Sequence, residues 1–143
     1  MQSVHDHTII SYEVNFESSR LIFNTQYETN EIAITAEVVF SGYLAHSFDF
    51  EMRNSIIFDI EEYSYDLFFK KEHILLDNKH RYAWPIHYES KEELRNFLLI
   101  HKYKVFNISS SIGLCGIVFA KQLDIIETGN NPKEPISRII LPL

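Results

Sequence analysis

Cysteine is nearly absent from this sequence of 143 residues, and its single thiol, Cys115, has no partner for a disulfide within the chain. Small secreted domains commonly depend on disulfides, whereas thiols stay reduced inside the cell. Residues 1–7 also lack the basic and apolar regions of a secretory signal peptide. Both features predict a cytoplasmic protein.

Long apolar runs are missing as well. A stretch such as residues 117–120 falls far short of the roughly 20 residues that a membrane-spanning helix needs, so we expect no membrane partner. No segment matches a specific catalytic, metal-binding or nucleotide-binding motif either. This absence favours a protein without enzymatic activity or cofactor over an enzyme.

Basic residues are scarce in the first part of the chain. Residues 1–66 contain twelve Asp or Glu against only Arg20 and Arg53, a balance of −10, whereas residues 67–143 contain eight acids and eleven bases, a balance of +3. An acidic half repels the phosphate backbone, which argues against nucleic-acid binding. The same charge would attract a basic protein partner, although it serves solubility equally well.

The sequence does contain ample material for one core, because 45% of its residues are hydrophobic and 14% are aromatic. A chain of this length can bury about 68–70% of its unfolded surface, as a single domain does. We place that domain at residues 1–127. Residues 128–143 begin with turn formers and are expected to be a C-terminal tail, either docked or flexible.

Alternating apolar and polar residues predict three strands near the N-terminus, at residues 8–16, 20–28 and 31–40. The short polar breaks at residues 17–19 and 29–30 join them as an antiparallel meander. The predicted apolar face consists of Ile10, Tyr12, Val14 and Phe16, then Leu21, Phe23, Thr25 and Tyr27, and finally Ile32, Ile34, Ala36, Val38 and Phe40.

The middle of the chain predicts another strand and two helices. Residues 41–54 are ambiguous between a short helix and an irregular crossing, and residues 55–62 have the pattern of a fourth strand. Ser64 is placed to cap a helix that ends near residues 78–82. Ser90 and Glu93 form a capping box, in which the Ser90 side chain accepts a hydrogen bond from the Glu93 N–H and the Glu93 side chain reaches back toward Ser90. A second helix is therefore expected to begin there.

Two further strands are expected at residues 104–109 and 113–126, joined as a hairpin through residues 110–113. Together these elements make an α+β domain with an antiparallel sheet of about six strands and two helices packed on one face. The apolar face of the meander is expected to pack on those helices. Its other face would carry Glu13 and Glu37 into solvent.

His5, Asp6 and His7 are candidate metal ligands, because His5 and His7 would lie on one side of an extended strand, roughly 6.6 Å apart. A further ligand would have to come from elsewhere in the chain, with His46 and His87 as candidates. The spacing matches no zinc or iron motif, so an exposed strand start explains the triplet better than a metal site does.

Acidic residues are the main candidates for partner binding. Asp59 and Glu61 alternate onto one side of the fourth strand, where they form either a contact surface or simply a solvated edge. Trp84 is a candidate anchor if it is exposed, and a core or lid residue otherwise. We expect Cys115 to be a buried, inert thiol. The predicted partner-binding set is Glu13, Glu37, Asp49, Glu51, Asp59, Glu61, Glu62 and Trp84.

Residues 5–16 (HDHTIISYEVNF), 41–46 (SGYLAH), 59–63 (DIEEY) and 84–86 (WPI) carry a resemblance to a family. They are similar to a group of small, uncharacterised Firmicutes-type bacterial domains that resemble the immunity proteins of polymorphic toxins. The resemblance extends to about residue 127 and excludes the tail. It implies a protein that masks a toxin, and it transfers no catalytic residue to this sequence.

The sequence therefore predicts a non-enzymatic, acidic protein-binding domain whose partner is basic, such as a toxin neutralised by an immunity protein. Two alternatives remain open. One is a small metal-dependent enzyme that uses the N-terminal His-Asp-His. The other is a homo-oligomeric structural domain, a homodimer for example, that pairs through a strand edge or the tail.

Overall fold

The structure, a computed structural model, describes residues 3–133, so most of the predicted tail lies outside the described residues. In chain order the elements are β1 (Thr8–Asn15), β2 (Arg20–Glu28), β3 (Ile32–Ser41), β4 (Ala45–Asp49), β5 (Ile56–Tyr63), α1 (Tyr65–Lys71), α2 (His73–Lys79), the 3₁₀ helix η1 (His80–Tyr82), α3 (Lys91–Ile100), β6 (Lys104–Ile112), β7 (Cys115–Ala120) and β8 (Gln122–Pro132).

Over residues 3–133 the fold is α+β, with one sheet in the strand order β4-β7-β6-β5-β1-β2-β3-β8. Every neighbouring pair of strands whose register is defined is antiparallel. The predicted class is confirmed. The strand number is not, because the sheet has eight strands and is accompanied by three α-helices rather than two.

Two bends create the additional strands. β3 continues through Gly42 into β4, and β7 continues through Lys121 into β8. At this point the Lys121 N–H donates to the Ser41 carbonyl at 2.9 Å. A Cβ on Gly42, whose φ is 63°, would lie 2.8 Å from the Lys121 side chain, so a glycine is needed there. The ambiguous residues 41–54 thus contain the strand β4. Residues 113–126, expected to form one strand, are divided between β7 and β8.

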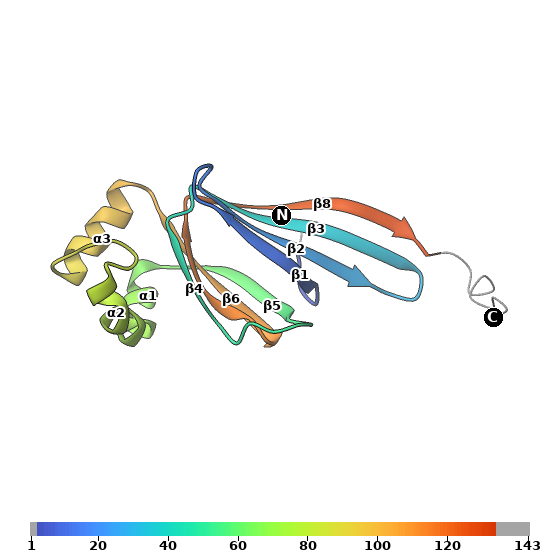
Figure 1. The fold of residues 1–143 in the computed structure, drawn as a ribbon, viewed down its shortest axis with the longest axis horizontal. Coiled ribbons are helices and arrows are strands. Elements are labelled where there is room, and N and C mark those ends of the chain that lie inside the picture. Colours follow the sequence, from blue (N-terminus) through green and yellow to red (C-terminus); the bar gives the residue numbers. More distant parts are fainter. Residues whose placement is uncertain (1–2, 134–143) are drawn as a thin grey trace.

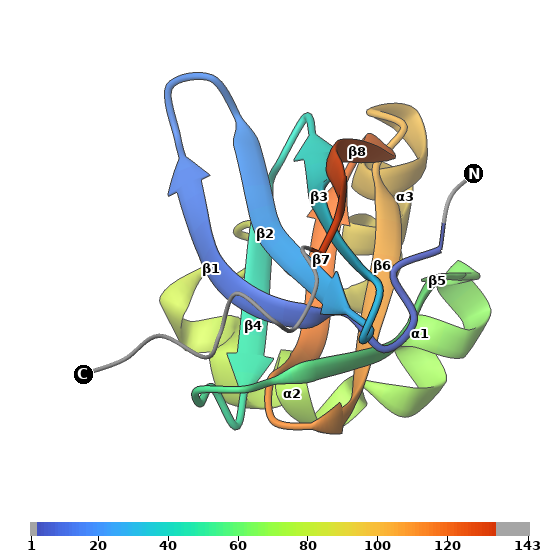
Figure 2. The same cartoon turned by 90° about the vertical axis from the view of Figure 1, so that its right-hand side faces the viewer.

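The bends roll the sheet into two facing halves, β1-β2-β3-β8 and β4-β7-β6-β5, as Figures 1 and 2 show. β1 and β5 close the roll by a short contact at Thr8 and Ile56, where the Ile57 N–H also donates to the His7 carbonyl at 2.9 Å. Farther along, the two strands diverge (Figure 1).

The main core lies inside the roll and takes side chains from both halves. Its buried members include Leu21, Phe23, Val38, Phe40, Ile57, Phe106, Ile108 and Val118. The prediction that the apolar face of the meander packs on the helices is wrong. The bends fold the second half of the sheet over that face, so the meander packs on other strands.

The helices instead cover the outer face of β4, β7 and β6 (Figure 1). This second core contains Phe68, Leu76, Leu94 and Leu98 from the helices, with Val105, Ile117 and Phe119 from the strands. Alternate residues of β7 therefore serve both cores. One face of this half-sheet is covered by helices, and its other face is covered by strands.

A bulge in β1 makes its register differ from the predicted one. The pairing of β1 with β2 shifts between Ile9 and Ser11, so Ile10 is 58% exposed while Ile9 packs on the core. Phe16 lies beyond the end of β1 and is also exposed. Both were expected on the apolar face, and a single extra residue is enough to shift the alternation.

Both predicted helix caps are present. Ser64 Oγ accepts from the Leu67 N–H at 3.1 Å, and Ser90 Oγ accepts from the Glu93 N–H at 3.1 Å. Glu93 reaches back, although to the Glu89 N–H at 3.3 Å rather than to Ser90. The first predicted helix is interrupted at Glu72, which separates α1 from α2.

The last strand, β8, ends later in the chain than predicted. β8 runs through the turn-forming residues and pairs with β3 as far as Ile32 and Pro132, past the expected break at residue 128. A register shift between Thr35 and Ala36 accommodates the irregular segment. None of the helices in residues 3–133 combines the length and apolarity required to cross a bilayer.

Candidate functional site

The connection between β4 and β5, residues 50–55, presents large apolar side chains to solvent; we call it the β4–β5 loop. Phe50 is 76% exposed and Met52 is 59% exposed. The Met52 side chain lies against Gly113 in the β6–β7 turn, beside the exposed Ile112. The loop and this turn lie at the same end of the sheet (Figure 2). Single exposed apolar residues are ordinary, but neighbouring ones indicate a contact surface.

The backbone of the β4–β5 loop is left-handed at two positions and strained at the first of them. Phe50 has a φ of 60° and Asn54 has a φ of 63°. Asparagine tolerates this left-handed region, whereas a bulky residue rarely occupies it, at a cost of roughly 1–2 kcal/mol. Such strain persists only where surrounding contacts impose it, and it is concentrated at functional sites.

Three hydrogen bonds hold the loop in this conformation. Tyr12 Oη donates to Glu51 Oε1 at 2.8 Å, and Ser55 Oγ donates to the Met52 carbonyl at 2.7 Å. The same Ser55 hydroxyl accepts from the Leu114 N–H at 3.0 Å. Burial and the bonded Glu51 carboxylate raise the pKa of Tyr12 to about 12, so its hydroxyl remains a donor at neutral pH. The loop is therefore preorganised.

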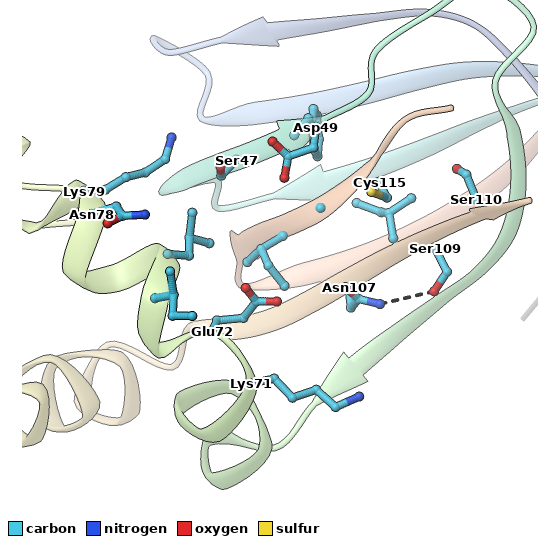
Figure 3. A pocket seen from close by; sticks show the side chains of 16 residues that line it. Ser47, Asp49, Lys71, Glu72, Asn78, Lys79, Asn107, Ser109, Ser110 and Cys115 are labelled. Carbon is cyan, nitrogen blue, oxygen red and sulfur yellow. Dashed lines mark hydrogen bonds between the residues drawn. The ribbon is translucent and has the colours of Figure 1, made fainter. Parts of the chain in front are cut away.

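A groove of about 700 Å³ lies beside the loop, between α1–α2 and the outer face of β4, β7 and β6 (Figure 3). Asp49 lines it from the end of β4 and Glu72 from the junction of α1 and α2. Burial and the nearby Asp49 carboxylate raise the pKa of Glu72, while Lys71 opposes this shift. Burial, Asp49 and Glu72 together raise the pKa of the Cys115 thiol. The residue is only partly buried and lines the groove, so the expectation of a buried thiol is wrong.

The predicted acids are divided among several surfaces. Glu13 and Glu37 lie on the outer face of the β1-β2-β3-β8 half, opposite the core. Asp49 and Glu51 lie at the β4–β5 loop, next to the exposed Arg53. These residues share no continuous surface.

On β5, Asp59 and Glu61 do share one side, because they lie two residues apart in a regular stretch that pairs with Ser109 and Asn107, and both are exposed. Glu62 is the only acid of the predicted set that makes an ion pair among the described residues, with Lys104 at 3.9 Å. Most of the predicted negative charge is thus left uncompensated, but it is spread over the fold.

Trp84 is half-buried in the second core rather than fully exposed. Its ring packs edge-on against Phe119 at 5.5 Å, and its Nε1–H donates to the His46 carbonyl at 3.1 Å. The Lys79 ammonium lies over the ring, 5.4 Å from its centroid. These contacts place the ring at the edge of the second core, so Trp84 is not an exposed anchor.

The histidines of the predicted metal site do not converge. Asp6 has a φ of 66° and residues 5–6 form a turn, so the assumption of an extended strand is wrong. His7 is buried, with its Nδ1 bonded to Thr25 Oγ1 at 2.9 Å. His46 bonds Tyr43 at 2.6 Å, and His87 lies 3.3 Å from Glu89. Within residues 3–133, no three His, Cys, Asp or Glu residues are arranged to hold a metal ion.

Sequence reasoning missed Phe50 and Met52 as candidate contact residues. Phe48, Phe50 and Met52 alternate with Asp49 and Glu51, which is a strand pattern. β4 ends at Asp49, however, so only Phe48 packs on the core while Phe50 and Met52 are left in solvent. The sequence signal for these contact residues is an alternation of apolar and acidic residues that continues past the end of β4.

Comparison of the chain with family models, curated proteins and solved structures gives no match. The function must be inferred from the geometry, and the resemblance to immunity-related domains remains a prediction.

Proposed function

We propose that this protein is a non-enzymatic, cytoplasmic binding domain that docks a basic protein partner on its β4–β5 loop, and that the partner is a toxin it neutralises. The exposed pair Phe50 and Met52 carries this proposal. Both side chains stand in solvent on a strained loop that hydrogen bonds hold in place. An isolated monomer gains nothing from this arrangement, whereas a binding surface gains preorganised apolar anchors.

Apolar contact should supply most of the affinity. Burying Phe50 and Met52 in a partner is worth roughly 1.5–3 kcal/mol for each side chain. Exposed ion pairs typically contribute about 0–1 kcal/mol each. The anchors therefore decide whether the complex is stable, and the acidic residues decide which partners approach.

The charge of the protein favours a basic partner. The chain has a net charge of −7, and Asp49 and Glu51 beside the anchors have no ion-pair partner among the described residues. Arg53 lies in the same loop and leaves a small negative balance there. Complementary charge accelerates encounter and discriminates against acidic proteins. The resemblance to immunity-related domains is the reason for proposing a toxin as the partner.

Affinity capture with three baits tests the proposal. The wild-type protein and a Phe50→Ser/Met52→Ser variant would be compared with Phe16→Ser/Leu99→Ser, which alters two apolar residues that are exposed elsewhere. The probes are lysate of the source organism and purified products of neighbouring genes. We expect one basic protein to be retained by the wild type and the control but lost by the loop variant. Equal retention by all three, or no retention at low ionic strength, would refute the proposal.

A homo-oligomer remains the second candidate, because the eleven-residue strand β8 ends the sheet order and pairs on one side only among the described strands. Open edges of this kind can pair with a second copy. Sedimentation over a wide concentration range tests this candidate. A single monomeric species throughout would eliminate it.

A further inference from the structure

A second surface, at the helical end of the molecule, combines exposed apolar side chains with a pocket. At the end of α3, Leu99 is 61% exposed and Ile100 is 70% exposed. Leu99 also lines a pocket of about 380 Å³, which lies between the junction of β5 with α1 and the turn that joins α3 to β6. This end of the protein lies away from the β4–β5 loop (Figure 1). We call the pocket and the two side chains the α3–β6 surface.

The walls of this pocket are largely aromatic and are held in place by contacts of their own. Tyr63, Tyr65 and Tyr103 all line it. Tyr65 Oη donates to the Tyr103 carbonyl at 2.5 Å, and the Tyr103 ring stacks on Phe97 with 5.9 Å between centroids. The volume of the pocket lies within the range of roughly 300–1,000 Å³ that is typical of ligand pockets. The pocket is therefore suited to one apolar side chain of a ligand.

The charged groups at the α3–β6 surface are mainly basic, although the whole chain has a net charge of −7. Lys102 and Lys104 line the pocket, and Lys121 Nζ lies over the Tyr103 ring, 5.1 Å from its centroid. Among the described residues, Glu62 is the only acid that lines the pocket, and it lies 3.9 Å from Lys104. Lys102 and Lys121 make no ion pair with any residue in the range 3–133. Two cations beside an apolar pocket are thus left without a carboxylate.

Lys102 occupies a backbone position that favours glycine. It follows the C-cap of α3 with a φ of 61°, and its N–H donates to the Leu99 carbonyl at 3.2 Å. The next N–H, of Tyr103, donates to the Leu98 carbonyl at 2.8 Å. Helices commonly end with glycine at this position, because any side chain there costs conformational free energy. This turn instead holds an unpaired ammonium group beside the pocket.

We propose that the α3–β6 surface binds an acidic peptide segment of a second protein, with one apolar side chain in the pocket and carboxylates on Lys102, Lys104 and Lys121. This binding goes beyond the proposed function, because it uses another surface and an occupant of opposite charge. Charge complementarity selects an acidic segment over a basic one. A peptide, rather than a single small anion, matches both the three lysines and the exposed Ile100 outside the pocket.

Titration of the ¹⁵N-labelled full chain with an acetylated and amidated EEFEE peptide, followed by NMR, tests the surface directly. The matched controls are KKFKK, which reverses the charge, and EEAEE, which lacks the large apolar side chain. We expect saturable shifts at the amides of Tyr65, Leu99, Lys102 and Tyr103 with EEFEE. Binding of EEAEE should be about tenfold weaker, and KKFKK should give no shift at these amides. Equal binding of either control, or no saturable shift with EEFEE, would overturn the proposal.

Variants assign the peptide to these side chains. Lys102→Gly removes the ammonium group at a position where glycine fits the backbone, so it should weaken EEFEE binding by about two- to fivefold without lowering the urea midpoint of unfolding. Lys133→Gln removes the same charge beyond the end of β8, at the opposite end of the sheet (Figure 1), and should leave the affinity unchanged. Wild-type affinity in Lys102→Gly would contradict the assignment.

The two proposals fail separately, because they use different surfaces. Phe16→Ser/Leu99→Ser should lose EEFEE binding yet retain the basic partner, whereas Phe50→Ser/Met52→Ser should do the reverse. Retention of the peptide by the first variant, or its loss in the second, would place the peptide elsewhere and overturn this inference. Peptide binding as expected, without capture of any basic protein, would overturn only the docking function.

Discussion

Phe50 adopts a backbone conformation that costs free energy for a bulky residue. Its side chain is mostly in solvent, and its φ of 60° belongs to the region that favours glycine. Replacing Phe50 by glycine should therefore raise the free energy of unfolding by about 1 kcal/mol. Phe50→Ala is the matched control, because it removes the ring but keeps the strained backbone. Urea denaturation checks the pair, and a Phe50→Gly protein no more stable than Phe50→Ala would show that the loop is not strained.

His7 should make stability depend on pH. Burial lowers its pKa below the ordinary 6.5. Its Nδ1–H donates to Thr25 Oγ1, since that hydroxyl already donates to the Ala36 carbonyl at 3.0 Å. Between the folded pKa and 6.5 the unfolded chain binds more protons, so stability rises with pH and is complete above 6.5. It is lost as the pH falls below 6.5.

The variant His7→Asn keeps a donor near Thr25 without a titrating ring. Urea unfolding of both proteins at about pH 5 and about pH 7.5 isolates the contribution of His7. The wild type should lose more stability than the variant on acidification. Burial lowers the pKa of His46 in the same direction, so the variant retains part of the dependence. Equal losses in the two proteins would mean that His7 is not held neutral.

Among the elements, the pairing of β4 with β7 is the most sensitive to sequence. Gly116 has a φ of 152°, and a Cβ there would lie 2.0 Å from the Ser47 carbonyl oxygen. The clash is with backbone and cannot be relieved by a rotamer change. Gly116→Ala should therefore destabilise the fold by about 2–3 kcal/mol and separate β4 from β7.

Gly129→Ala is the control for this substitution. Its Cβ would lie 2.7 Å from Thr35 Oγ1 and at an ordinary contact distance of 3.7 Å from Asn131 Nδ2, and the glycine has no positive φ. A threonine can change rotamer, so the cost should be well below that of Gly116→Ala. Chemical denaturation of both variants makes the comparison. A smaller loss for Gly116→Ala than for Gly129→Ala would contradict the described pairing.

An element could be predicted from the sequence where neighbouring residues determine it, and could not where contacts between distant segments do. The caps at Ser64 and Ser90 depend on neighbouring residues, so the sequence alone predicts both helix starts. The bends at Gly42 and Lys121 depend on a contact between two distant segments, which one sequence does not reveal. β4 is short, and its pattern continues into exposed residues, so the sequence does not identify it as a strand. The β1 bulge at Ile10 carries no local signal.

At the scale of the whole molecule, the acidic half of the sequence does not become one acidic face. The rolled sheet carries Glu13 and Glu37 to one surface and Asp49 and Glu51 to another. The sequence revealed the excess of negative charge but not its distribution, because distribution depends on the bends. The candidate surface for the basic partner is therefore limited to the β4–β5 loop and the groove beside it.

This distribution predicts which charges guide the partner. Asp49→Asn/Glu51→Gln should slow association by about threefold or more, most strongly at low salt. Glu13→Gln/Glu37→Gln removes the same charge from the opposite surface and should have a smaller effect. Stopped-flow association rates at several salt concentrations provide the measurement. Equal slowing in both variants would mean that net charge, and not the loop surface, attracts the partner.

In the proposed function, the strained loop presents Phe50 to a partner. The most direct measurement is calorimetric titration of the captured partner into Phe50→Gly, alongside the wild type. Loss of one buried aromatic anchor should weaken binding by about tenfold or more, although the variant is the more stable protein. An unchanged Kd for Phe50→Gly would contradict the account.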